Sequence, residues 1–145
     1  MNIENLSLKG RAFFCVALAE RATTYLQKEY LDSVSDATRL CRVWMNAGKC
    51  SADTLCQFWD DEDQGFTLIQ EEEDDEVKIN AWNCIIDAIA IISRMAYESE
   101  GQIFFPEPIE MVDDSTFLHM VDSLVLCNSN EAEFVSDTYE MCLQK

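Results

Sequence analysis

The chain has 145 residues, of which 48% are hydrophobic and 10% aromatic. This composition excludes a disordered protein and predicts one domain, residues 1–145, that buries a core of its own. The formal net charge is −18, from 28 acidic and 10 basic residues. Because such a charge repels nucleic acids and anionic membrane surfaces and attracts cationic proteins, we expect neither a nucleic-acid nor a membrane partner.

The negative charge is concentrated in the last two thirds of the chain. Residues 1–49 carry 7 basic and 5 acidic side chains, a net charge of +2. Residues 50–145 carry 3 basic and 23 acidic side chains, a net charge of −20. The negative field that attracts cationic partners therefore comes from the part of the chain after position 49.

The cysteines indicate a reducing compartment. They are odd in number, they include no Cys-x-x-Cys pair, and most fall on the apolar faces of expected helices, where a free thiol packs as a small hydrophobic group. The chain shows no secretory signal pattern and no run of about 20 apolar residues, so we expect a cytoplasmic protein. No zinc site is expected, because zinc requires close ligand pairs. The seven cysteines are Cys15, Cys41, Cys50, Cys56, Cys84, Cys127 and Cys142.

Apolar residues recur at helical spacing from the beginning of the chain. The first helix is predicted over residues 8–29. A second begins near Ser33, where Ser33 and Asp36 have the spacing of a capping box, and it ends before Gly48. A short third helix follows, with Ser51 as its N-cap, and runs to about Trp59.

The fourth helix, predicted over residues 74–98, has the strongest pattern because apolar residues occupy most of its faces, so its middle should be buried. Two further helices are predicted over residues 115–127 and 131–143, and residues 65–70 and 102–105 are candidates for short strands. The expected fold is therefore all-α, a single compact domain of about six helices around a long central buried helix.

The stretch between residues 60 and 76 holds ten carboxylates and no basic residue. Acidic residues before the next helix favour its dipole, but this accounts for only a few of them. Such dense like charge serves either solubility or the binding of a basic partner, and both remain open on charge alone. The ten candidate binding residues are Asp60, Asp61, Glu62, Asp63, Glu71, Glu72, Glu73, Asp74, Asp75 and Glu76.

Part of this stretch has the spacing of a twelve-residue calcium loop, with Asp60 at position one, Gly65 at six and Glu71 at twelve. Glu62 and Gln64 replace the usual shorter side chains at positions three and five, and no second such loop exists. We therefore expect no metal or other cofactor, and keep a degenerate calcium-binding loop at residues 60–71 as an alternative.

The sequence does not predict an enzyme. His119, the single histidine, lies in an expected helix without a known catalytic signature around it, and we interpret it as a packed or solvated residue. No glycine-rich phosphate loop is present, and no small-molecule ligand is expected. Asp87, in the buried part of the fourth predicted helix, is expected to pair with Arg94 or with an arginine of the N-terminal third.

Several scattered positions resemble a family of bacterial immunity proteins that protect cells against polymorphic or contact-dependent toxins. The similarity covers about residues 8 to 125 and includes no catalytic motif. The matching segments are Ala-Leu-Ala-Glu-Arg at residues 17–21, Trp44 near the end of the second helix, residues 55–60 before the acidic break, Asn-Ala-Trp at 80–82, Met-Ala-Tyr at 95–97, and Pro-Glu-Pro-Ile-Glu at 106–110.

The resemblance implies a small cytoplasmic protein that inactivates a toxin by binding it, without catalysis. If the toxin is a nuclease, its cleft is basic because it holds phosphates, and an acidic inhibitor associates with it quickly. We therefore predict that the ten carboxylates bind a cognate toxin, and that this toxin is a nuclease with a basic surface. The alternative function is a helical adaptor or regulatory protein, with the degenerate calcium loop at residues 60–71.

Overall fold

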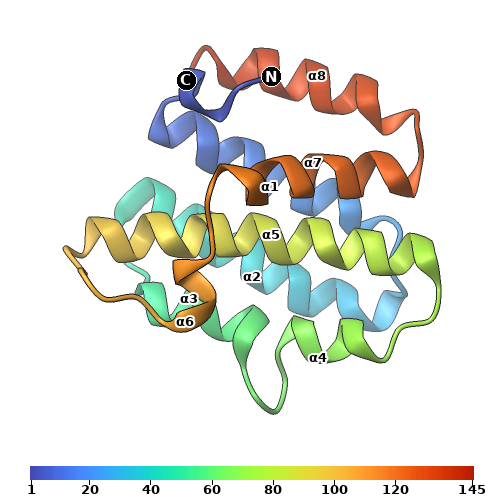
Figure 1. Cartoon of the computed structure of the whole chain (residues 1–145), viewed down its shortest axis with the longest axis horizontal. Helices are drawn as coiled ribbons and strands as arrows, with labels where there is room; N and C mark the ends of the chain where they lie inside the picture. Colours follow the sequence, from blue (N-terminus) through green and yellow to red (C-terminus); the bar gives the residue numbers. More distant parts are fainter.

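The computed structural model describes all 145 residues as helices and connecting turns, without a strand (Figure 1). Two short 3₁₀ turns, Ile3–Asn5 and Lys28–Tyr30, precede the first and second helices. The eight α-helices are α1 (Leu8–Thr23), α2 (Leu31–Ala47), α3 (Ala52–Asp60), α4 (Phe66–Glu71), α5 (Glu76–Ser99), α6 (Glu107–Glu110), α7 (Asp114–Cys127) and α8 (Glu131–Cys142). The expectation of an all-α fold is confirmed.

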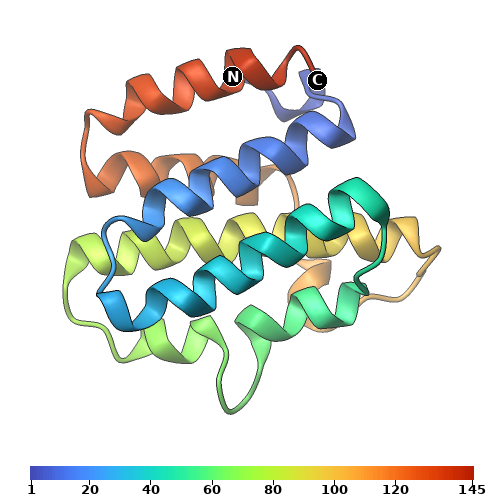
Figure 2. The same cartoon turned by 180° about the vertical axis from the view of Figure 1, so that it is seen from behind.

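The longest helix, α5, runs through the middle of the molecule, and the other helices surround it (Figures 1 and 2). It packs most extensively against α7, α1 and α3, and Trp82, Ile85 and Ile89 on it are almost completely buried. By length and composition α5 could cross a membrane, but 61% of its most apolar window is buried inside the protein, as in a core helix. The predicted central buried helix is therefore confirmed.

The two ends of the chain lie side by side (Figures 1 and 2). The backbone N–H of Asn2 donates to the Tyr139 hydroxyl at 3.2 Å, and that hydroxyl donates to the Asn2 carbonyl at 2.8 Å. Helix α1 also approaches α8 so closely that a Cβ atom on Gly10 would lie 2.6 Å from the carbonyl oxygen of Cys142. Glycine at position 10 therefore permits the first and last helices to pack against each other.

Two predicted helix ends are confirmed. Ser51 caps α3, with its side chain accepting from the N–H of Thr54, and Gly48 follows α2 in the left-handed conformation at φ 61°. The first helix is shorter than predicted, because α1 ends at Thr23 rather than near residue 29. Thr23 and Thr24 turn their hydroxyls onto the preceding carbonyls of α1, which competes with continuation of the helix.

The predicted capping box was wrong. Helix α2 begins at Leu31, directly after a 3₁₀ turn, so Ser33 and Asp36 lie inside the helix instead of at its start. Its N-cap residue, Tyr30, makes no side-chain cap and instead packs edge-on against Trp82 at 5.4 Å between ring centroids. Tertiary packing thus sets the beginning of α2, two residues earlier than the local pattern indicated.

Both candidate strands were wrong. Residues 65–70 form most of α4, whose Phe66 is buried against Trp82 with 5.2 Å between ring centroids. Residues 102–105 form an irregular connection between α5 and the four-residue helix α6. The prediction of about six helices therefore missed α4 and α6, which are too short to produce a helical pattern in the sequence.

Candidate functional site

The ten carboxylates of the acidic stretch lie on consecutive elements at one side of the molecule. They occupy the end of α3, the turn before α4, the end of α4, and the turn that begins α5 (Figure 1). Eight of them are exposed, and Asp61 and Glu73 are partly exposed. None forms an ion pair, although five ion pairs exist elsewhere in the protein. The stretch is therefore a surface of uncompensated negative charge.

The turn between α3 and α4 is fixed by its own hydrogen bonds. The Asp61 side chain accepts from the backbone N–H groups of Asp63 at 2.8 Å and Gln64 at 3.0 Å. The Thr67 hydroxyl donates to the Trp59 carbonyl at 2.7 Å and ties the two helices together. Asp63 is consequently held at the surface by a defined turn, as a preorganised contact requires.

The turn between α4 and α5 is fixed in the same way. Glu73 accepts from the backbone of Asp75 at 3.1 Å and from Gln27 at 3.3 Å, and these hydrogen bonds lower its pKa. Asp75 caps α5 by accepting from the N–H of Lys78. Asp61, Glu73 and Asp75 thus have structural roles, whereas the other seven carboxylates form no side-chain hydrogen bond. These seven are Asp60, Glu62, Asp63, Glu71, Glu72, Asp74 and Glu76.

Crowding of like charge is visible at the beginning of the stretch. The pKa of Asp60 is raised by partial burial and, to a smaller extent, by the nearby charge of Glu62. Both groups therefore gain from a cation placed beside them, because it offsets desolvation and repulsion together. The acidic stretch is consequently suited to a partner that supplies positive charge.

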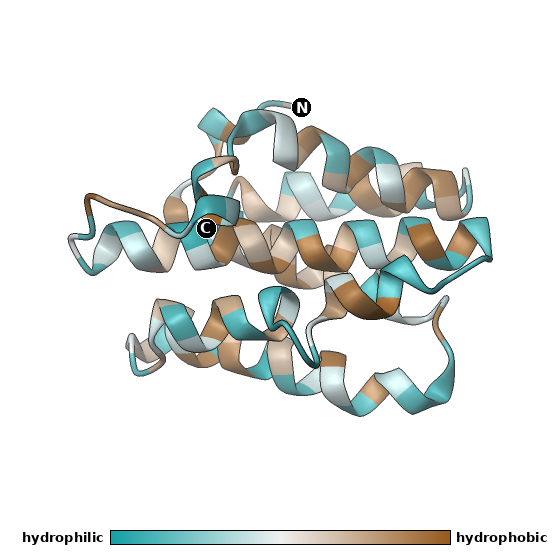
Figure 3. Cartoon of the chain, turned by 60° about the horizontal axis from the view of Figure 1, so that its bottom comes forward, coloured by the Kyte–Doolittle hydropathy of each residue, from teal (hydrophilic) through white to brown (hydrophobic).

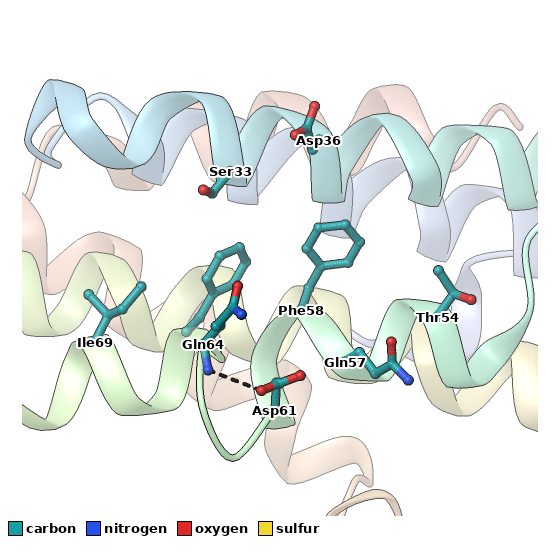
Figure 4. A pocket seen from close by; sticks show the side chains of 9 residues that line it. Ser33, Asp36, Thr54, Gln57, Phe58, Asp61, Gln64 and Ile69 are labelled. Carbon is teal, nitrogen blue, oxygen red and sulfur yellow. Dashed lines mark hydrogen bonds between the residues drawn. The ribbon is translucent and has the colours of Figure 1, made fainter.

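A groove of about 280 Å³ opens beside the acidic stretch, between α2, α3 and α4 (Figure 4). Phe58 points from α3 toward α2, and Asp61 and Gln64 form the end of the groove at the turn (Figure 4). The groove thus places an apolar ring next to carboxylates, and a long cationic side chain carries both matching parts. The residues that line it are Ser33, Asp36, Thr54, Gln57, Phe58, Asp61, Gln64, Phe66 and Ile69.

The degenerate calcium loop does not form a ligand cage. Its second half is the helix Phe66–Glu71, so Glu71 lies at the far end of this helix from the turn that holds Asp61. An EF-hand loop instead wraps its first and last ligands around one ion. No group of three or more His, Cys, Asp or Glu side chains in the chain is arranged to hold a metal ion. Residues 60–71 therefore form the last residue of α3, a turn and the helix α4.

Asp87 and His119, which the sequence analysis considered separately, lie together. The Nδ1 atom of His119 on α7 is 2.5 Å from Oδ2 of Asp87 on α5. The predicted pairing of Asp87 with Arg94 or with an arginine of the N-terminal third was wrong. The Arg94 guanidinium bonds to the carbonyls at the end of α6 and to Glu98, and no N-terminal arginine pairs with Asp87. No hydroxyl or thiol hydrogen-bonds to Asp87 or His119, so the geometry lacks the nucleophile of a catalytic triad.

The sequence analysis also missed an exposed apolar segment. Ile103 and Phe104, in the connection between α5 and α6, are 83% and 85% exposed, and Met111 just after α6 is 77% exposed. Residues 102–105 were interpreted as a strand, but no neighbouring strand exists to cover them. The useful signal was the position of three large apolar residues, Ile103, Phe104 and Phe105, between Gly101 and Pro106, outside any helical stripe.

Comparison with known proteins identifies the family. The family described as Immunity protein Imm6 matches residues 10–127, which run from the third residue of α1 to the end of α7 and include the whole acidic stretch. Neither the curated proteins nor the solved structures contain a match to this chain. The resemblance to immunity proteins that scattered positions indicated is confirmed. The chain belongs to the Imm6 family of immunity proteins, which act against a toxin.

Proposed function

We propose that this immunity protein neutralises its toxin by binding it through the acidic stretch, without catalysis, and that the toxin is a nuclease. The observation that carries the proposal is the set of seven surface carboxylates with no intramolecular partner. Uncompensated like charges destabilise a folded protein, so their retention at one site is explained by a benefit in the bound state. A cationic partner surface provides that benefit.

A nuclease has the matching chemistry. Its substrate cleft carries basic side chains because it neutralises phosphates, and an acidic protein surface competes for the same groups. Complementary charge raises the association rate by steering the encounter, which favours rapid neutralisation of a toxin inside the cell that makes the immunity protein. We accordingly place the binding reaction in the cytoplasm of that cell.

The test measures association and dissociation rates with the cognate toxin domain, identified by co-purification with the tagged immunity protein and then purified alone. The acidic variant carries Glu62→Lys, Asp63→Lys, Glu71→Lys and Glu72→Lys, none of which touches a side-chain hydrogen bond. The matched control reverses four exposed carboxylates of α7 and α8 that also lack hydrogen bonds and ion pairs, so that the net charge changes equally. Its substitutions are Asp122→Lys, Glu133→Lys, Asp137→Lys and Glu140→Lys.

We expect the acidic variant to associate at least about tenfold more slowly than the control at low salt, with the difference shrinking as salt is raised. An association rate equal to that of the control would reject the acidic stretch as the contact. Binding without catalysis also predicts that toxin activity falls linearly and ends at one immunity protein per toxin. Digestion of DNA or RNA by the free toxin domain, abolished at that ratio, tests the nuclease assignment.

A further inference from the structure

The connection between α5 and α6 carries the most exposed large apolar side chains of the protein. Ile103 and Phe104 are the two most exposed large hydrophobic residues, and Phe104 is the only aromatic residue of fifteen that is classed as exposed. Figure 3 shows this connection as a hydrophobic segment at the left end of the molecule. The hydrophobic core holds 35 buried residues, and Phe104 belongs neither to it nor to the partly buried residues packed against it.

The chain that follows Phe104 is held against α5. The ring of Phe105 packs against Tyr97 at 6.3 Å between centroids, and the Arg94 guanidinium lies 4.9 Å from the same ring. Arg94 also donates to the carbonyls of Ile109 at 3.2 Å and Val112 at 2.8 Å, which ties the segment to α6. The apolar tip is therefore presented by an ordered base, which lowers the entropy lost when it is bound.

The surroundings of this tip are acidic, which restricts what can cover it. Four exposed glutamates flank the tip in sequence, of which one, Glu98, is ion-paired with Arg94 at 3.0 Å and the other three form no ion pair. A second copy of this chain, an anionic membrane or a nucleic acid would each bring like charge to the tip. A protein with an apolar pocket rimmed by lysine or arginine fits both the tip and its border. The glutamates are Glu98, Glu100, Glu107 and Glu110.

Helix α3 connects the apolar tip to the acidic stretch. Its beginning is hydrogen-bonded to the end of α5. The Tyr97 hydroxyl donates to Asp53 at 2.5 Å, and the backbone N–H of Ala52 donates to Glu100 at 3.1 Å. Its end, Asp60, begins the acidic stretch. Nine helical residues span roughly 14 Å, so one partner covering the usual ~800 Å² of surface reaches both ends.

We propose that Ile103 and Phe104 form an apolar anchor that inserts into an apolar, basic-rimmed pocket on the toxin. This inference rests on the proposed function, binding of a toxin, and adds to it a contact that holds the complex rather than one that speeds its formation. Large aromatic side chains in desolvated pockets dominate binding at protein interfaces, and their loss acts mainly on the dissociation rate.

The test uses the double variant Ile103→Ala with Phe104→Ala, called the anchor variant, and each single variant. Binding of each to the same purified toxin domain is measured. Leu126→Ala with Met141→Ala is the matched control, because both are exposed apolar residues on α7 and α8. We expect the anchor variant to dissociate roughly 10- to 100-fold faster, with an association rate within about twofold of wild type and an unchanged melting temperature. A dissociation rate equal to that of the control overturns the anchor.

The outcomes separate this inference from the proposed function. If the wild-type protein does not bind the toxin domain, both the proposed function and the anchor are rejected. If the acidic variant behaves like its control while the anchor variant dissociates faster, only the acidic stretch is rejected as a toxin contact. If sedimentation shows a wild-type dimer that Phe104→Ala separates, or if the wild type binds phosphatidylcholine vesicles and the variant does not, the tip has another occupant and the anchor is overturned.

Discussion

The Nδ1 atom of His119 lies 2.5 Å from Oδ2 of Asp87, and the two side chains differ sharply in their exposure to solvent. The Asp87 side chain is 16% exposed on the core helix, whereas the His119 side chain is 57% exposed. Burial raises the pKa of Asp87 from 3.8 to about 6, although the hydrogen bond and charge of His119 oppose that rise. Desolvation of the carboxylate thus outweighs the attraction of its partner.

We predict that Asp87→Asn stabilises the protein at pH 7 by roughly 1–2 kcal/mol and has no effect near pH 3.5. The pKa of Asp87 is higher in the folded state, so the folded protein retains this proton while the unfolded chain loses it. The stability contributed by Asp87 therefore falls as pH rises from about 4 to about 6. Urea unfolding of wild type and variant at four pH values between 3.5 and 7 measures the difference.

Asp122→Asn is the control for that experiment, because Asp122 is an exposed carboxylate on α7 without a hydrogen bond or ion pair. It should leave the stability unchanged across the same range. Destabilisation by Asp87→Asn at pH 7 would show that the contact with His119, rather than desolvation, dominates.

The core of the fold was predictable because its signals are local. Helix α5 has apolar residues on most faces along six turns, and Ser51 and Gly48 have conformational preferences that fix helix ends. The short helix α4 was not predictable, since it depends on stacking of Phe66 against Trp82 from a distant helix. A six-residue helix has little stability of its own and is too short to show a periodic pattern of apolar residues in the sequence.

The candidate site was predictable only in its composition. The ten carboxylates were recognised from their density, but the division into three structural and seven unpaired groups depends on hydrogen bonds formed in the fold. Asp87 and His119 are 32 residues apart and meet because α5 packs against α7. The exposure of Phe104 likewise follows from the absence of any neighbouring element over residues 102–105.

A second prediction concerns Glu131, which is buried at the start of α8. Its carboxylate accepts from Arg21 Nε at 2.7 Å and from the Tyr25 hydroxyl at 2.6 Å. Burial acts to raise the pKa of Glu131, but the hydrogen bonds and the charge of Arg21 prevail and lower it. We predict that Glu131→Gln costs about 1–3 kcal/mol of stability at pH 7. The amide is uncharged, and it places an N–H donor where the carboxylate has its second acceptor oxygen.

The pH dependence of this effect is opposite to that at Asp87. The pKa of Glu131 is lower in the folded state, so its contribution is complete above the unfolded value of 4.5 and is lost as pH falls below that value. The cost of Glu131→Gln should therefore shrink between pH 5 and pH 3 in urea unfolding. Glu133→Gln, an exposed neighbour on α8, serves as the control, and an equal cost in both variants would contradict the role of burial.

A third prediction concerns the reactivity of the thiols. Burial raises the pKa of every cysteine in the chain, most strongly at Cys15 and Cys84, which are completely buried. Cys50 and Cys127 are the two that remain partly exposed. We expect iodoacetamide at pH 8 to modify these two first, with the other five protected until the protein unfolds. Peptide mass spectrometry over time gives the order, and early modification of Cys84 would contradict the packing of α5 against α1.

A fourth prediction concerns Gly65, which closes the turn of the acidic stretch. A Cβ atom at this position would lie 2.7 Å from the backbone nitrogen of Asp61 and 2.8 Å from the carbonyl oxygen of Trp59. These backbone atoms belong to the hydrogen-bonded turn and cannot move aside as a flexible side chain would. We predict that Gly65→Ala lowers the free energy of unfolding by about 1–3 kcal/mol in urea.

Gly48→Asn is the matched control for the turn. Gly48 has a positive φ of 61°, but nothing lies within 4 Å of a Cβ atom there, and asparagine tolerates the left-handed conformation. It should therefore cost less than Gly65→Ala. Because Gly65 carries no charge, Gly65→Ala should also slow toxin association far less than charge reversal of Glu62 and Asp63 does. An equal loss of association would mean that the geometry of the turn, and not its charge, governs the encounter.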